Sequence, residues 1–161
     1  MKVFDNLFDD QSFKFINDAF HDSLKKPWEI NKYLWQPYLT ESYDGFVLMQ
    51  HVSDPVKRLV NDAIKEYVQF NEQPGIMFYM WNEGSGINWH TDDHVEKACT
   101  IYLNDWPLER GGQFVYKEDD TDKIIPIKKN RIVINDDSTE HKVTRVRKSR
   151  DIRYTLQVFG K

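Results

Sequence analysis

The first 72 residues contain two segments in which apolar side chains recur every three or four positions, the spacing of an amphipathic helix. Asp9 precedes the first segment, and Ser53-Asp54-Pro55 opens the second. Asp and Ser are favoured helix N-caps, and Pro is favoured in the first turn. We therefore predict one helix from Asp9 that ends before Pro27, and a second from Ser53 that ends before Asn71.

From Gly75 onwards, short apolar runs of β type alternate with turn-forming residues such as Asn135-Asp136-Asp137. Another short strand, at the edge of a sheet, is expected near Gly45–Gln50. The runs after Gly75 predict about eight strands, namely Ile76–Trp81, Ile87–Thr91, Lys97–Leu103, Gln113–Tyr116, Lys123–Ile127, Arg131–Ile134, His141–Val146 and Ile152–Phe159.

Two helices followed by eight short strands predict a mostly β fold. We expect a double-stranded β-helix, or jelly-roll, in which two sheets face each other and the helices pack on the major sheet. A chain of 161 residues suits one core. The predicted organisation is a single domain over 1–161, with 1–72 as a helical support region and 75–160 as the jelly-roll core.

Composition narrows the class of protein. Forty per cent of the residues are hydrophobic and 30% are charged, which excludes a disordered chain. No apolar run reaches 18 residues, and Met1–Asp10 lacks the features of a signal peptide, so a soluble, cytoplasmic protein without membrane association is expected. The lone Cys99 excludes internal disulfides and multi-cysteine zinc sites. A net charge of −4 argues against general nucleic-acid binding.

His90-Thr91-Asp92 is the first candidate for chemistry. In a strand, positions i and i+2 point to the same face, so the imidazole and the carboxylate would converge. His141 begins another predicted strand and can reach the same point across a two-sheet sandwich. Two histidines and one carboxylate suit non-haem Fe(II), although an isolated pair of this kind also arises by chance. His94-Val95-Glu96 has similar spacing, but it lies in a loop and is interpreted as surface.

Arg153 is the second candidate, because it lies in the last predicted strand, where it alternates with apolar residues. A guanidinium buried on such a strand is costly unless it meets an anion. The carboxylate of a small acid, held by two parallel hydrogen bonds, would offset that cost. The alternative is an arginine at the strand end that extends to water.

Four ordered blocks together resemble the Fe(II)/2-oxoglutarate-dependent dioxygenases, and most closely their prolyl 4-hydroxylase-like branch. The blocks are Gly86–Asp92, then Thr100–Asn104 with Gly111-Gly112-Gln113-Phe114, then His141-Lys142-Val143, and finally Arg153–Leu156. They span roughly residues 75–160. The resemblance implies Fe(II) as the metal, 2-oxoglutarate and O2 as cosubstrates, and ascorbate as a candidate reductant.

The resemblance also implies roles for individual residues. His90, Asp92 and His141 would be the iron ligands, and Arg153 would pair with the distal carboxylate of 2-oxoglutarate. Three further residues would bind the cosubstrate: Tyr102 at the same carboxylate, Gln157 where that branch often has Thr, and Tyr79 if the turn at Gly84–Gly86 is one residue longer than usual.

The spacing of the basic residue departs from the family. The usual interval after the distal histidine is nine or ten positions, which Arg150 satisfies, whereas Arg153 is twelve positions after His141. Arg153 remains the choice, because Tyr154–Phe159 reproduces the strand that carries the arginine.

The resemblance implies hydroxylation of an unactivated C–H bond, with release of succinate and CO2, and its first choice of substrate is a prolyl residue in a peptide or protein. A small-molecule substrate remains open. The alternatives are an oxidative demethylase of alkylated nucleobases and a cupin-like metal-binding jelly-roll without 2-oxoglutarate chemistry. An interaction module without any metal would require the His90-Thr91-Asp92, His141 and Arg153 blocks to be coincidental.

Overall fold

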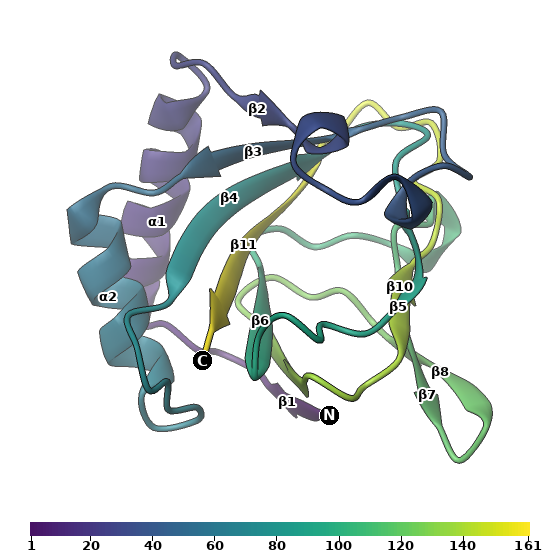
Figure 1. The fold of residues 1–161 in the computed structure, drawn as a ribbon. Coiled ribbons are helices and arrows are strands. Elements are labelled where there is room, and N and C mark those ends of the chain that lie inside the picture. Colours follow the sequence, from purple (N-terminus) through teal and green to yellow (C-terminus); the bar gives the residue numbers. More distant parts are fainter.

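The computed structural model describes all 161 residues and contains two antiparallel sheets that face each other (Figure 1). The seven-stranded sheet has the order β1-β9-β6-β11-β4-β3-β2, and the four-stranded sheet has the order β5-β10-β7-β8. The strands are β1 (Lys2–Phe4), β2 (Glu29–Ile30), β3 (Val47–His51), β4 (Gly75–Trp81), β5 (Ile87–His90), β6 (Lys97–Tyr102), β7 (Phe114–Glu118), β8 (Thr121–Ile125), β9 (Ile132–Asp136), β10 (His141–Val143) and β11 (Arg153–Gly160). The mostly β jelly-roll prediction is confirmed.

Both predicted helices are present. The helix α1 (Asp10–Ser23) begins after Asp9, whose carboxylate accepts a hydrogen bond from the backbone N–H of Ser12. The helix α2 (Asp54–Ile64) ends earlier than the sequence pattern indicates. Neither helix has the length and apolar character needed to cross a membrane.

The first 72 residues supply strands as well as helices. The strand expected near Gly45–Gln50 is β3, but it is not at the edge, because β2 pairs with its outer side. β1 was not predicted, since three residues carry too little pattern to reveal a strand. Asn135 corrects a second expectation: it lies within β9 rather than in a turn.

The major sheet separates two clusters of buried apolar side chains. On its outer face, α1 and α2 pack against residues such as Phe78, Ile101 and Leu156 (Figure 1). On its inner face, Trp81 and Tyr102 belong to a cluster that includes Phe114 from the minor sheet. The strands of the major sheet therefore contribute side chains to the helical core on one face and to the space between the sheets on the other.

The hairpin of β7 and β8 extends away from the body of the molecule (Figure 1). Its connection is the dipeptide Asp119-Asp120, and both residues have positive φ, at 49° and 58°. Such values are characteristic of the two-residue turn that matches the twist of a hairpin. The acidic run Glu118–Asp122 thus forms the tip of this hairpin.

Candidate metal and cosubstrate site

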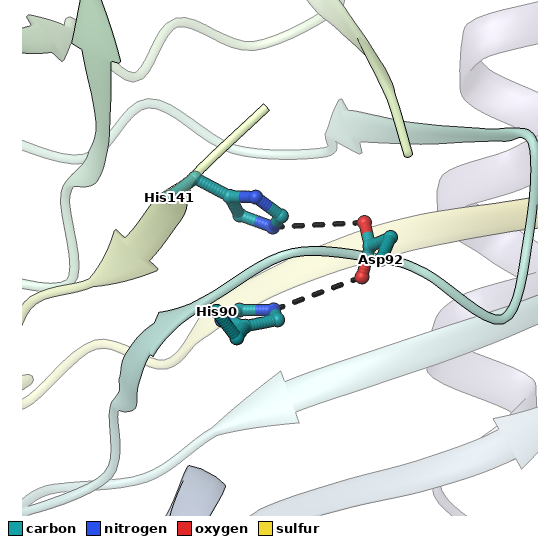
Figure 2. A group of neighbouring side chains, drawn as sticks. All are labelled: His90, Asp92 and His141. Carbon is teal, nitrogen blue, oxygen red and sulfur yellow. Dashed lines mark ion pairs between the residues drawn. The ribbon is translucent and has the colours of Figure 1, made fainter. Parts of the chain in front are cut away.

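Two strands of the minor sheet bring the three candidate ligands together (Figure 2). His90 ends β5, and His141 begins β10 directly opposite it. The strand ends at His90 rather than at the predicted Thr91, and Asp92 belongs to the loop that follows it. Its carboxylate nevertheless lies between the imidazoles, with Oδ1 3.7 Å from His90 Nε2 and Oδ2 3.6 Å from His141 Nε2. All three ligand atoms lie within 4.8 Å of one another.

Backbone carbonyls fix the orientation and the tautomer of both histidines. His90 Nδ1 lies 2.8 Å from the carbonyl oxygen of Asn88, and His141 Nδ1 lies 2.8 Å from that of Thr139. Because a carbonyl only accepts, each Nδ1 carries the hydrogen, and each Nε2 keeps its lone pair for a metal. Burial, together with the nearby His90, lowers the pKa of His141, which favours the neutral ligand form.

Asp92 has a different kind of support. Its side chain is buried and forms no ion pair with Lys or Arg. The side-chain amide of Asn135 donates a hydrogen bond to Asp92 Oδ2 at 2.8 Å. Sequence reasoning missed this residue, because Asn135 stands among turn-forming residues and no spacing rule connects it with Asp92.

The donor set fits a divalent transition metal. Two neutral imidazole nitrogens and one carboxylate oxygen are the ligands that non-haem Fe(II) takes on one face, with other positions left open. Adjacent ligands of such an ion are separated by about 3 Å, so the spacing between the donors requires only small side-chain adjustments. His90, Asp92 and His141 can therefore hold the metal.

A cavity of about 480 Å³ extends from these residues between the two sheets. His90 and His141 lie on the minor-sheet side, and Arg153, Gln157 and Tyr79 line it from the major sheet. The site is thus a shared space into which both sheets project polar groups.

Arg153 is the most unusual residue of the cavity. It is 1% exposed, yet none of its three guanidinium nitrogens has a hydrogen-bond partner. Its Cζ lies 4.3 Å from the ring centroid of Trp81, and burial lowers its pKa to about 10. A buried cation without an anion is unfavourable, so the cavity is suited to an acidic ligand. Arg150, the alternative by counting, is exposed in the preceding turn.

Tyr102 stands beside Arg153 rather than on the cavity wall. Arg153 Cζ is 5.7 Å from the centroid of the Tyr102 ring. The Tyr102 hydroxyl is fully buried and has no hydrogen-bond partner, and burial raises its pKa to about 12. Two kinds of unpaired donor, a guanidinium and a phenol, are therefore neighbours.

Gly112 makes the position of Arg153 possible. Its φ is +66°, a value that L-residues rarely adopt, and a Cβ there would lie 2.9 Å from Arg153 Cδ and 3.2 Å from Arg153 Nε. The glycine at position 112 of the Gly111-Gly112 block is thus explained by the lack of room for a side chain beside Arg153.

The remaining predicted residues also reach this region. Gln157 accepts a hydrogen bond from Thr100 at 2.9 Å and donates one to Thr155 at 3.2 Å, so its amide is oriented by the protein. Tyr79 is buried on the wall, and burial raises its pKa. His94 lies at the cavity with a side chain that is 69% exposed.

A jelly-roll in which two histidines and one aspartate can hold a metal ion between the sheets is consistent with the non-haem metal oxygenases. Residues 75–160 match the family model described as the 2OG-Fe(II) oxygenase superfamily, and the chain belongs to that family. The protein is therefore an oxidoreductase that uses Fe(II) and 2-oxoglutarate. Comparison with curated proteins finds no match.

Solved structures support the fold. A prolyl-4-hydroxylase from Pseudomonas putida is similar with a TM-score of 0.71 and 12% identity, over 98% of this chain and 90% of that one. A Trichoplax adhaerens prolyl hydroxylase in complex with a hypoxia-inducible-factor peptide has a TM-score of 0.77 and 11% identity, over 98% and 81%. HygX from Streptomyces hygroscopicus, with nickel, 2-oxoglutarate and hygromycin B bound, has a TM-score of 0.69 and 12% identity, over 98% and 81%.

Proposed function

We propose that His90, Asp92 and His141 are the Fe(II) ligands, and that Arg153 and Tyr102 bind the distal carboxylate of 2-oxoglutarate. The observation that carries this proposal is the buried guanidinium of Arg153, whose N–H groups have no partner in a cavity shared with the metal ligands. A dicarboxylic acid would reach both parts of the site, since one end can approach the metal and the other the arginine.

When bound, Fe(II) and 2-oxoglutarate supply the oxidant that inserts one oxygen atom of O2 into a C–H bond, while 2-oxoglutarate becomes succinate and CO2. The residues of this chain bind the metal and the cosubstrate and orient them. The two imidazoles present unprotonated Nε2 atoms, and Arg153 fixes the far end of the cosubstrate by charge-assisted hydrogen bonds. Gln157 and Tyr79 complete the wall beside it.

The proposed substrate is a prolyl residue of a peptide or protein. The sequence blocks around Tyr102 and Gly111-Gly112 support this choice, as does the similarity in fold to prolyl hydroxylases. At the cavity, Leu34 is 54% exposed and Tyr38 is 52% exposed, and Trp35 lies between them in the sequence. Such apolar surface suits the ring of proline better than a charged side chain.

The first experiment is an anaerobic titration of the Fe(II) protein with 2-oxoglutarate, followed by the weak visible charge-transfer band of the complex. Arg153→Met should raise the dissociation constant of 2-oxoglutarate at least about 10-fold, because charge-assisted bonds contribute about 1.5–3 kcal/mol each. Arg150→Ala is the matched control and should leave it within about twofold. An effect of Arg150→Ala alone would contradict the proposed role of Arg153.

The substrate is tested separately with wild-type enzyme. Prolyl-containing peptides and small molecules are compared by succinate release and by a mass increase of one oxygen atom in the substrate. Hydroxylation of small molecules but of no prolyl peptide would contradict the proposed substrate and leave the oxygenase site intact.

A further inference from the structure

Asn135 makes the hydrogen bond that determines how Asp92 is presented to the metal. It is 2% exposed, and its strand β9 belongs to the major sheet, whereas Asp92 follows β5 of the minor sheet. Pairing of Asn135 with Ala98 in β6 fixes its backbone. Its amide crosses between the sheets to reach Asp92 Oδ2 at 2.8 Å.

The two oxygens of Asp92 are therefore not equivalent. Oδ2 accepts the Asn135 amide, while Oδ1 accepts no hydrogen bond from the protein. A hydrogen bond occupies one lone-pair direction and restrains rotation of the carboxylate. Oδ2 keeps one further lone pair, whereas Oδ1 has both of its lone pairs available and is consequently the oxygen favoured for binding a metal.

The donor is also neutral. Lys or Arg at this position would offset the negative charge of Asp92 and compete with a metal cation, whereas an amide orients the carboxylate and leaves its charge available. Asn135 thus combines the two requirements of a supporting residue, which are a fixed donor and no net charge.

We propose that Asn135 is a positioning residue that holds Asp92 for metal binding through Oδ1 alone. Binding by one oxygen rather than two keeps an additional coordination position open, which an enzyme with two cosubstrates requires. This inference rests on the proposed role of Asp92 as a ligand.

The test is Asn135→Leu, a substitution of similar size without a hydrogen-bond donor. The dissociation constant of Co(II), measured by competition with a chelating dye, should rise about 10- to 100-fold, as is usual when a partner of a metal ligand is removed. The visible absorption spectrum of the Co(II) protein should also change, because Asp92 is then free to bind through both oxygens. Asn17→Ala is the matched control: its amide donates a hydrogen bond to the carbonyl of Phe13 in α1, away from the metal ligands, and its loss should change neither quantity.

A Co(II) dissociation constant within twofold of wild type and an unchanged spectrum for Asn135→Leu would overturn the inference. If this variant does not fold by circular dichroism, Asn135→Ala, which introduces no new bulk, is measured in the same way. Asp92→Ala separates the two levels of the argument. If Asp92→Ala loses Co(II) binding and the Asn135 variants keep it at the wild-type level, only the role of Asn135 is refuted. Undiminished binding in Asp92→Ala refutes the proposed ligand set itself.

Discussion

Tyr102 illustrates how a single residue can cost stability in the absence of ligand. Its hydroxyl is buried beside Arg153 without a hydrogen-bond partner. An unsatisfied buried polar group is unfavourable, whereas the same group becomes favourable once an acceptor is present. The stability of the free protein and its affinity for 2-oxoglutarate therefore respond in opposite directions to the loss of this hydroxyl.

We predict that Tyr102→Phe leaves the free energy of unfolding of the ligand-free protein unchanged or raises it by up to about 1 kcal/mol. The same change should weaken 2-oxoglutarate binding about 10-fold, since a hydrogen bond to a charged acceptor is lost. Urea denaturation and the anaerobic titration measure the two effects. Tyr67→Phe, in the helical core, serves as control and should not alter the titration. A loss of stability without loss of affinity would count against the proposed contact.

Individual residues also show what the sequence can and cannot predict. The i, i+2 spacing anticipates that His90 and Asp92 converge. His141 also reaches them, but from the strand beside His90 in the same sheet and not across the two sheets as predicted. Asn135 follows no such rule, because its contact with Asp92 depends on how two sheets are spaced. Its usual preference for turns is outweighed by a buried hydrogen bond inside a strand.

At the scale of elements, the long alternating runs were predicted well and the short edge strands were not. All eight strands after Gly75 are present with shifted ends, since a period of two is clear over four or more residues. β1 and β2 contain three and two residues, and their existence depends on the partners β9 and β3. Tertiary pairing, rather than local pattern, makes them strands.

The turn before β7 offers a prediction about Gly112. Gly112→Ala should weaken 2-oxoglutarate binding about 10-fold and lower the free energy of unfolding by about 1–3 kcal/mol, because its Cβ would strain the backbone and displace Arg153. Gly75→Ala is the control, since its Cβ would meet nothing closer than 3.8 Å. The anaerobic titration measures the 2-oxoglutarate affinity, and urea denaturation measures the free energy of unfolding. Normal 2-oxoglutarate binding by a destabilised Gly112→Ala protein would show that Arg153 does not depend on this turn.

The edge strand β1 is held by a charge pair that makes stability depend on pH. The Arg131 guanidinium donates two hydrogen bonds to Asp5, at 2.6 and 3.1 Å, and holds the pKa of that carboxyl at about 2, below its ordinary value of 3.8. Because the folded-state pKa is the lower one, the stabilisation is present above pH 3.8 and is lost as the pH falls through 2.

We predict that Asp5→Asn lowers the Tm by about 1–3 °C at pH 7, the range for a partly exposed pair in a chain of this size. The difference from wild type should shrink as the pH falls from 4 towards 2. Thermal melts across this range test it, with Asp62→Asn as a control on α2, where the pair with Lys65 is exposed. A difference independent of pH would exclude the charge pair as the cause.

For the whole molecule, the major sheet separates a buried cluster that stabilises the fold from a second cluster beside the proposed site. The helices cover one face of this sheet, and the proposed metal and cosubstrate residues lie at the other. We propose on this basis that residues 1–161 act as one catalytic unit, in which the helices of 1–72 cover the outer face of the sheet that carries the site, while Leu34 and Tyr38 of the same region line the cavity.

The prediction at this scale concerns Phe20, which is 2% exposed and stacks on Tyr154 with ring centroids 4.2 Å apart. Phe20→Ala should reduce the free energy of unfolding by about 3–5 kcal/mol, as large cavities in cores do. The folded fraction should bind 2-oxoglutarate with the wild-type dissociation constant. Phe15→Ala, on the same helix but 44% exposed, should cost much less. A weakened dissociation constant in folded Phe20→Ala would show that the two faces are coupled.

The alternation of side chains along β11 determines where the chain can tolerate insertions and deletions. Arg153 and Gln157 face the cavity, whereas Leu156 and Val158 belong to the helical core. Inserting or deleting one residue within this strand would exchange the two sets, placing charge among the helices and aliphatic groups beside the proposed iron ligands. The projecting hairpin tip at Asp119-Asp120 does not contribute side chains to two buried regions in this way. Variation in length should therefore accumulate at that hairpin, and the spacing within β11 should stay constant.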